Sequence, residues 1–426
     1  MINRKIKITA AAFLTTAALC SCSNNIGHEE NSKPEQTAAV TSAQQSSSAD
    51  STFINETTSR TSTVTDTDKT YICTSFKYEQ LSGNEKNIYN TVCAGLSEHK
   101  ETIELSTDIT IDSFNRVYDA VLTTMETQMY CPTRTYQYSY TESDSNVSKI
   151  VPEYKYSADD TQRIHEEVEA AVSEVLSQVS SEMSQVDIVR LFHDYIINDC
   201  EYEDRVNTAT DSEIEEMMHQ SDYDNAYGVL VRHKGVCEGY ARAFRYLCLR
   251  TGIECELVSG TSCGEGHMWN IVKLGSDWYH IDLTWDDPIL YSGKSEHDNI
   301  RYNYFNLSDE KILTDHTIDS TYYQYPGADS DSANFFIYYG LYAQSAESAD
   351  EIIKRELVKI YNNEERVIYI KAASEDVLSE IIQHLFEMNG LYDILSDIQD
   401  QADYLNDITQ VVKAVDNENL ILKIIL

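Results

Sequence analysis

Residues 235–241 read GVCEGYA, and residues 267–285 read HMWNIVKLGSDWYHIDLTW. The first stretch opens a helical pattern, in which large side chains recur at steps of three and four residues from Tyr240 to Cys248. Cys237 therefore stands at an expected helix N-terminus, where the positive end of the helix dipole favours a thiolate. The second stretch holds two apolar runs separated by Gly275-Ser276, which predicts a β-hairpin.

The predicted hairpin brings a histidine and an aspartate together. With a two-residue loop, residues whose numbers add to an odd sum share one face of the sheet, and 267 + 282 is 549. We therefore expect His267 and Asp282 to be opposite or diagonal neighbours. An aspartate in this position can orient the imidazole while His267 takes the proton from Cys237.

The middle of the chain, from about Asp194 to Asp309, resembles the bacterial transglutaminase-like superfamily of papain-type thiol enzymes. The matching blocks are His193-Asp194-Tyr195-Ile196, Ala226-Tyr227-Gly228-Val229-Leu230, residues 235–241, the segment around Gly260, the histidine stretch, Ile281-Asp282-Leu283-Thr284-Trp285-Asp286 and Tyr304-Phe305-Asn306. The resemblance implies an α+β fold with a papain-like core, in which a helix bearing Cys237 packs on an antiparallel sheet bearing His267 and Asp282. It also implies that Cys237 is the nucleophile, His267 the general base and acid, and Asp282 the orienting residue. We expect no cofactor.

Each of these residues also has a purely structural interpretation. Cys237 could be a buried thiol or half of a disulfide, His267 a hydrogen-bonded sheet histidine, and Asp282 a carboxylate at a strand end. Asp286 and Asp287 compete for the orienting role, although they precede Pro288 and are typical of a turn.

Other nearby residues suit supporting roles. His280 shares the face of Asp282 and is expected to be a neighbour of the triad, because it lies inside the second strand. Trp269 and Trp285 either line a cleft or belong to the core. A metal site built from Cys255, Cys263 and His267 is a further alternative, but its spacing matches no zinc signature.

The chemistry that follows is acyl transfer through a thioester. If water resolves the thioester, the enzyme is a peptidase or amidase; if a lysine amine does, it is a cross-linking transglutaminase. We favour hydrolysis of protein or peptide amides by analogy with multidomain bacterial members, and a cell-surface or cell-wall peptide fits as substrate. A catalytically silent surface binding or adhesion module is the alternative from a different class.

Composition excludes other classes of function. The chain has 426 residues, 42% of them hydrophobic, which is enough for two or three domains with real cores. Its 32 basic and 71 acidic residues give a formal charge of 32 − 71 = −39, with no basic cluster to bind nucleic acid or anionic lipid. No run of 18 apolar residues predicts a membrane-spanning helix.

The N-terminus predicts export and lipid attachment. Basic residues precede a short apolar run from Ile8 to Leu19, which is typical of a signal peptide over residues 1–21. The run ends in Leu19-Cys20-Ser21-Cys22, which resembles the bacterial lipobox with Cys22 as the lipidated residue. An ordinary cleaved signal is the alternative. We therefore expect a cell-surface protein whose only membrane contact is this anchor.

The remaining chain is expected to divide into a tether and three domains. Residues 22–70 form a disordered spacer, since 16 of the 30 residues from Thr41 to Thr70 are Ser or Thr. Residues 71–155 are expected to form an α+β domain, 156–325 the catalytic domain and 330–426 an α/β domain. Helices are predicted at 84–96, 112–125, 164–179, 186–197, 352–360 and 377–388, and strands at 102–111, 134–141, 334–342, 366–371, 409–414 and 420–426.

The other cysteines do not pair evenly. Without Cys20, Cys22 and Cys237, seven cysteines remain in the sequence. At least one must stay free or pair between molecules if the chain is exported, and no disulfide connectivity follows from the sequence.

Overall fold

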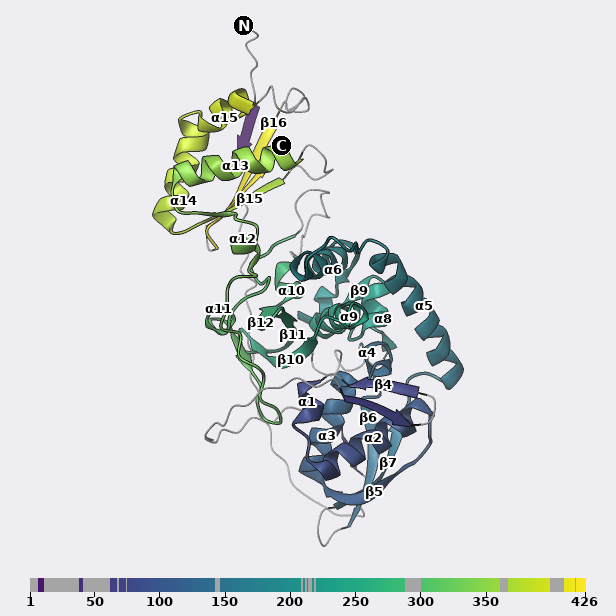
Figure 1. The fold of residues 1–426 in the computed structure, drawn as a ribbon. Coiled ribbons are helices and arrows are strands. Elements are labelled where there is room, and N and C mark those ends of the chain that lie inside the picture. Colours follow the sequence, from purple (N-terminus) through teal and green to yellow (C-terminus); the bar gives the residue numbers. More distant parts are fainter. Residues whose placement is uncertain are drawn as a thin grey trace. The chain divides into compact units, whose positions relative to one another are not determined.

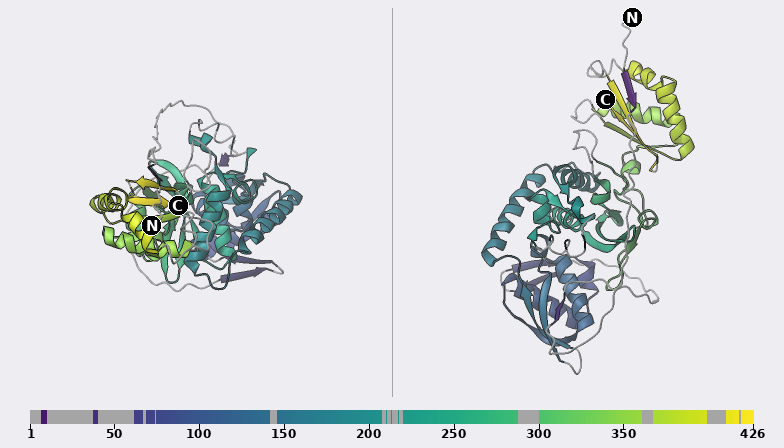
Figure 2. Two further views of the ribbon diagram at one scale, coloured as in Figure 1. Left: turned by 90° about the horizontal axis from the view of Figure 1, so that it is seen from above. Right: turned by 180° about the vertical axis from the view of Figure 1, so that it is seen from behind.

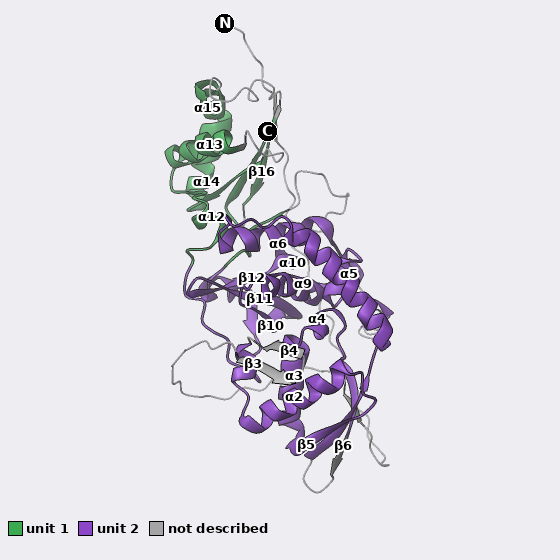
Figure 3. Cartoon of the chain, turned by 45° about the vertical axis from the view of Figure 1, so that its right-hand side comes forward, with its two compact units in different colours: residues 1–24, 290–306, 331–426 green, residues 25–289, 307–330 purple. Residues whose placement is uncertain are grey.

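The computed structural model describes most of the chain beyond residue 75. The described residues are 7–10, 38–40, 62–66, 69–73, 75–141, 146–207, 210, 213, 217, 220–287, 300–360, 367–398, 410–417 and 419–426. They belong to two compact units (Figure 3): residues 1–24, 290–306 and 331–426 in one, and residues 25–289 and 307–330 in the other. Cys22, Cys20 and Pro288 lie outside the described residues.

The larger unit begins with an antiparallel sheet covered by helices. Ser82 caps the first long helix with a capping box, since its hydroxyl accepts from the Glu85 N–H and the Glu85 carboxylate accepts from the Ser82 N–H. The sheet has the strand order β2-β6-β7-β5. The elements are β2 Ala38–Val40, β3 Ser62–Asp66, β4 Lys69–Cys73, α1 Phe76–Glu79, α2 Gly83–Ser97, β5 Ile103–Thr110, α3 Ile111–Thr124, α4 Thr127–Tyr130, β6 Thr135–Thr141 and β7 Asn146–Glu153.

The second half of the larger unit holds a helical layer against a four-stranded sheet of order β12-β11-β10-β13. Helix α9 packs on β10 and β11 (Figure 1), and Figure 2 gives two further views of the ribbon, from above and from behind. The elements are α5 Ala158–Leu176, α6 Gln185–Asp199, β8 Glu201–Tyr202, η1 Asp204–Asn207, α8 Ala226–Leu230, β9 Lys234–Gly235, α9 Cys237–Arg250, β10 Cys255–Ser262, β11 Glu265–Leu274, β12 Asp277–Ile281, α10 Leu283–Asp286, α11 Asp309–Ile312 and β13 His316–Ile318. This mixture of helices and antiparallel strands confirms the expected α+β fold.

The smaller unit is a mixed sheet with helices. Its strands follow the order β1-β16-β17-β15-β14, in which β1 and β14 pair parallel to their neighbours. The elements are β1 Lys7–Ala10, α12 Phe335–Tyr338, β14 Tyr342–Ala343, α13 Ala346–Ile360, β15 Val367–Ala372, α14 Glu375–Ile382, the π-helical turn η2 Gln383–Glu387, α15 Gly390–Ile398, β16 Gln410–Asp416 and β17 Ile421–Ile425. Strand β1 lies inside the expected signal peptide, so cleavage before Cys22 would make β16 an edge strand.

Three sequence-based expectations about elements are wrong. Residues 334–342 form the helical turn α12 and only the start of β14, in place of one strand. The second hairpin strand ends at Ile281 and continues as α10, where the sequence predicted a strand as far as Trp285. The helix predicted at 164–179 ends at Leu176, before Val179. The remaining predicted helices and strands are present, with ends shifted by a few residues.

No helix in the described part of the chain is both long enough and apolar enough to span a bilayer.

Candidate active site

Cys237 is the first residue of α9, and two close backbone approaches fix its position. The Val236 N–H donates to the Tyr223 carbonyl oxygen at 2.8 Å. A Cβ built on Gly239 would lie only 2.3 Å from that same oxygen, so a side chain at 239 would push the two segments apart. Because the first N–H groups of a helix have no intrahelical acceptor, the Cys237 thiol stands at a site that favours negative charge.

His267 projects from β11 beside this helix. The predicted two-residue turn is present, because Leu274 pairs with Asp277 and Gly275 adopts a positive φ of 64°. The observed pairs, such as Asn270 with Ile281, add to 551, so the odd-sum rule holds. The Cys237 thiol lies close enough to His267 to raise the pKa of the imidazole.

Asp282 follows β12 directly and is the N-cap residue of α10. Its Oδ1 accepts hydrogen bonds from the Thr284 N–H at 3.0 Å, the Thr284 hydroxyl at 2.7 Å and the Trp285 N–H at 3.3 Å. Its Oδ2 lies 2.5 Å from His267 Nε2. With Nε2 held by Asp282, Nδ1 is the ring nitrogen left to meet the thiol.

The charges of these groups reinforce one another. Burial opposes the imidazolium, but Asp282 and the Cys237 thiol together raise the pKa of His267 well above its ordinary value. Burial likewise opposes the carboxylate, while His267 and His316 hold the pKa of Asp282 below its usual range. The arrangement therefore favours a protonated His267 beside the ionised Asp282.

Trp269 supports the imidazole from the side. Its ring stacks on His267 at a centroid distance of 5.9 Å and an interplanar angle of 19°. Its Nε1–H donates to His280 Nδ1 at 3.0 Å, and His280 Nε2 lies 2.8 Å from Asp309. His280 is thus a hydrogen-bonded neighbour, as the sequence predicted, and the buried Trp269 belongs to the core under His267.

Residues 172–283 match the family model of the transglutaminase-like superfamily. The chain carries a transglutaminase-like domain. The kyphoscoliosis peptidases of Mus musculus and Homo sapiens are each 30% identical to this chain over 110 residues. The match covers 22% of this chain and 16% of each peptidase, so the chain spans about a sixth of the length of these relatives.

A solved structure of a TGase is similar to this chain with 16% identity and a TM-score of 0.24, over 46% of this chain and 54% of that one. Because this TM-score is low, the transglutaminase-like domain is identified by the family match.

Two residues of the site had no signal in the sequence analysis. Tyr202 on β8 pairs with Gly235 on β9, two residues before Cys237, and burial together with the neighbouring Cys237 raises the pKa of its phenol. His316 on β13 also reaches Asp282, with its Nε2 3.1 Å from Oδ2. Both come from short strands whose pairing only the fold reveals.

Asp286 and Asp287, the two alternatives for the orienting role, form hydrogen bonds with other residues. Asp286 lies 3.2 Å from Nε2 of His193, and both side chains are fully buried. Burial opposes the charged imidazole, but Asp194 and Asp286 raise the pKa of His193 to about 9. Asp287 accepts a hydrogen bond from the Tyr240 hydroxyl at 2.8 Å. Neither aspartate is therefore placed to orient His267.

The cysteine-based metal site is not assembled. Cys255 and Cys263 lie at opposite ends of β10, roughly 25 Å apart along an extended strand. Cys255 is buried, whereas Cys263 is exposed in the following turn. Among the described residues, His267, Asp282 and His316 each bring one ligand atom within 4.8 Å of the others, and hydrogen bonds already join these atoms.

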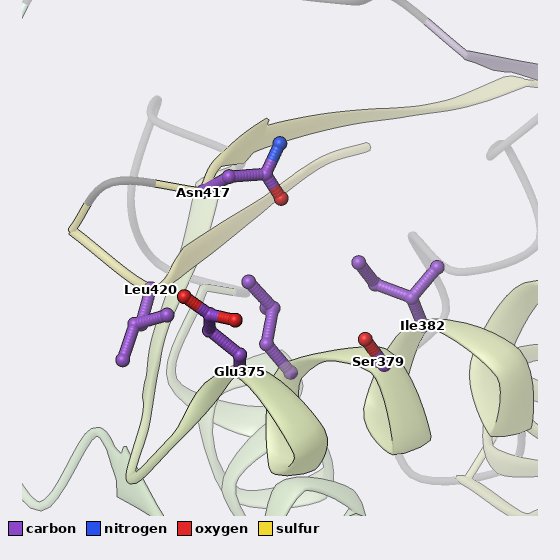
Figure 4. Close-up of a pocket in the computed structure, with 6 residues that line it drawn as sticks. Glu375, Ser379, Ile382, Asn417 and Leu420 are labelled. Atoms are coloured by element: carbon purple, nitrogen blue, oxygen red, sulfur yellow. The ribbon is translucent and has the colours of Figure 1, made fainter.

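A pocket of about 300 Å³ lies in the smaller unit, between α14 and the turn that joins β16 to β17 (Figure 4). Glu375, Ser379 and Ile382 line it from the helix, and Asn417 and Leu420 from the turn. The candidate active site is in the larger unit, so this pocket is not part of it.

Proposed function

We propose that this chain is a thiol enzyme that cleaves protein or peptide amide bonds through a thioester on Cys237. One observation carries the proposal: His267 interacts with the Cys237 thiol at the start of α9, which raises the pKa of the imidazole, and its Nε2 binds the carboxylate of Asp282 after β12 at 2.5 Å. A nucleophile, a proton carrier and an orienting anion in this order are what acyl transfer requires.

In the proposed reaction the Cys237 thiolate attacks the carbonyl carbon of the amide. The imidazolium of His267 gives its Nδ1 proton to the departing nitrogen, so that the C–N bond breaks and an amine leaves. The carbonyl oxygen, negatively charged in the intermediate, is stabilised by the N–H groups at the N-terminus of α9, which begins at Cys237. His267 then takes a proton from water, which attacks the thioester and releases the acid.

Hydrolysis is the first choice over cross-linking. The two curated relatives are named as peptidases, and the site itself serves either reaction, because water and a lysine amine attack the same thioester. We therefore propose a cysteine peptidase or amidase, with transamidation as the alternative that the experiment below separates.

The proposal includes a location at the outer face of the cell membrane. It rests on the N-terminal sequence, with its basic start, its apolar run and Cys22 after Ser21. A fatty-acid probe fed to cells should label the wild-type chain and not the Cys22→Ser variant. Equal labelling of the two would exclude lipidation at this residue.

The catalytic proposal is tested with a fluorescently labelled unfolded protein as hydrolysis substrate and a fluorescent primary amine as acyl acceptor. We expect peptide release in wild type, and its loss in both Cys237→Ala and His267→Ala, because nucleophile and base act as one unit. Cys263→Ser is the matched control, since Cys263 is exposed in a turn and should leave the rate unchanged.

Each outcome of this assay has a distinct meaning. Amine incorporation that exceeds hydrolysis would favour the cross-linking reaction. A wild-type Cys237 that iodoacetamide alkylates no faster than a small model thiol near neutral pH would refute a thiol enzyme and favour a surface binding module.

A further inference from the structure

A second histidine contacts the orienting carboxylate. His316 is the first residue of β13, and its side chain has no exposed surface. Its Nε2 lies 3.1 Å from Asp282 Oδ2, the same oxygen that binds His267, and its Nδ1 is hydrogen-bonded to Asp315 Oδ1. His316 lies 33 residues after the end of the family match at residue 283, since 316 − 283 is 33.

The hydrogen-bond partners of His316 determine its protonation. Asp282, with its lowered pKa, is ionised and can only accept hydrogen bonds, so His316 must donate from Nε2. On the other side Nδ1 faces a second carboxylate, and a lone pair there would be repelled. His316 thus carries a proton on both nitrogens. Burial and His267 oppose this charge, but the bonds to Asp282 and Asp315 raise the pKa of His316.

We propose that His316, held by Asp315, is a positioning residue that fixes Asp282 in the orientation which serves His267. The inference rests on the proposed function and extends the Cys237, His267 and Asp282 group by one imidazole and one carboxylate. It adds no step to the reaction, because His316 touches neither the thiol nor the reacting amide.

The proposed role has two separable parts. As a donor, His316 holds Oδ2 together with His267, while the start of α10 holds Oδ1, so both carboxylate oxygens are fixed. As a cation, it offsets part of the Asp282 charge and so weakens the hold of that carboxylate on the His267 proton. An imidazolium that is held too tightly gives up its proton less readily to a leaving amine.

The surroundings of His316 fit this double role. Among the described residues, the titratable groups that shift the pKa of His316 include Asp282 after β12, Asp315 before β13 and His267 on β11. Two tryptophan rings also contact His316. Trp269 packs edge-on at 5.0 Å between ring centroids, and the Trp285 ring lies at 5.5 Å. In such a weakly polar setting, charges and hydrogen bonds act more strongly than at a wet surface.

The experiment compares His316→Gln and His316→Phe with wild type in the full chain, with EDTA present to remove any bound cation. A glutamine amide can still donate to Asp282 but carries no charge, and phenylalanine keeps the ring shape without donor or charge. Thr317→Val, on the exposed face of the same strand, is the matched control. The measurements are kcat and KM on the labelled protein substrate, the pH dependence of kcat, and the melting temperature.

The two variants should separate donor from charge. We expect His316→Phe to lower kcat roughly 10- to 100-fold with KM unchanged, which is the usual effect of removing an outer hydrogen-bond partner. His316→Gln should keep kcat within about threefold of wild type. In the pH profile of kcat, activity falls on the alkaline side as His267 loses its proton. In both variants this alkaline limb should move to higher pH, because a cation that opposes protonation of His267 is gone. Thr317→Val should match wild type in kcat and in the limb.

The outcomes distinguish failure of the inference from failure of the function. If wild type neither turns over nor shows a reactive Cys237, the proposed function fails and the inference falls with it. If wild type is active and folded His316→Phe keeps its kcat and alkaline limb, the inference alone is wrong. A limb that moves to lower pH would also overturn it, since that result means Asp282 has simply been displaced.

Discussion

Both carboxylate oxygens of Asp282 accept hydrogen bonds, and each oxygen has a different role. Oδ1 caps the start of α10 through the N–H groups of Thr284 and Trp285, and Oδ2 accepts from two imidazoles. A carboxylate is the one side chain of this size that can accept all of these hydrogen bonds and donate none. The capping role also explains why the position ends a strand, since Asp is a preferred N-cap residue.

Asp282→Asn should therefore disable the site without unfolding it. The amide oxygen can keep the cap, but the NH₂ group then faces two imidazole N–H donors and cannot accept from either. We expect turnover to fall by up to roughly 10⁴-fold, as for other orienting carboxylates. The alkaline limb of the pH profile should move to lower pH, because the anion that raises the pKa of His267 is lost.

The measurement is kcat as a function of pH, with Asp277→Asn as the control. Asp277 lies on the same hairpin and is exposed to solvent. Turnover within tenfold of wild type and an unmoved alkaline limb in Asp282→Asn would show that Asp282 does not orient His267.

Individual residues differ in how far the sequence could predict them. His267 and Asp282 could be paired in advance because a two-residue turn sets the register, and the structure brings them to 2.5 Å. His316 could not, because 34 residues separate it from Asp282, and its approach depends on which strand adds to β10. No local pattern reports the pairing of a three-residue strand.

At the level of elements, periodicity predicted the helices well and was less reliable for short apolar runs. Residues 335–338 read Phe-Phe-Ile-Tyr, four side chains that favour strands, yet they form one helical turn. There Phe335 and Phe336 are buried, and the ring of Phe335 stacks on Tyr302 at 3.6 Å. Packing outweighs propensity in so short a segment, and the sequence does not reveal that packing.

The approach of β13 to β10 depends on a single glycine. A Cβ built on Gly260 would lie 1.8 Å from the Thr317 carbonyl oxygen and 2.9 Å from the Trp269 ring. No real side chain tolerates the first distance, so Gly260→Ala must push β13 away. His316 precedes Thr317 on that strand, and its bond to Asp282 should be broken with it.

We expect Gly260→Ala to lower the free energy of unfolding by roughly 1–3 kcal/mol, the usual cost of overpacking. Its kcat should fall at least as far as that of His316→Phe. Chemical denaturation and the same turnover assay measure the two effects. Gly83→Ala is the control, because a Cβ there meets no atom within 4 Å. Wild-type kcat in folded Gly260→Ala would show that the place of β13 does not matter to the site.

At the scale of the larger unit, residues before 156 are bound to the catalytic helix by buried charge. Arg134, just before β6, pairs with Glu238, the residue after Cys237, at 2.8 Å, and with Asp224 at 2.7 Å. Arg242 on α9 is almost fully buried and donates to the carbonyl oxygens of Leu122 and Gln128 at 2.8 and 2.9 Å. The sequence shows none of these contacts, because each joins segments about 90 or more residues apart.

These contacts bear on whether residues 156–325 can act alone, as the sequence analysis expected. Removal of residues 1–155 leaves the Arg242 guanidinium without two acceptors and Glu238 without one of its two arginines. Water can replace these partners at the newly exposed face, but it does not hold the side chains of the first turn of α9 in place. The affected turn begins at Cys237, so we expect the fragment 156–330 to lose most of the thiol reactivity that the fragment 75–330 retains.

A substitution tests the same idea without truncation. Arg134→Met keeps much of the packing volume and removes one cation from Glu238 and Asp224, which should cost roughly 1–3 kcal/mol in the free energy of unfolding. Iodoacetamide labelling of Cys237 should slow in this variant and not in Arg163→Met, since Arg163 pairs only at the surface of α5 among the contacts described. A fragment 156–330 that folds and alkylates at the rate of 75–330 would instead make the catalytic segment an independent domain. In that case the buried arginines would serve docking of residues 75–155 and contribute nothing to the reactivity of the thiol.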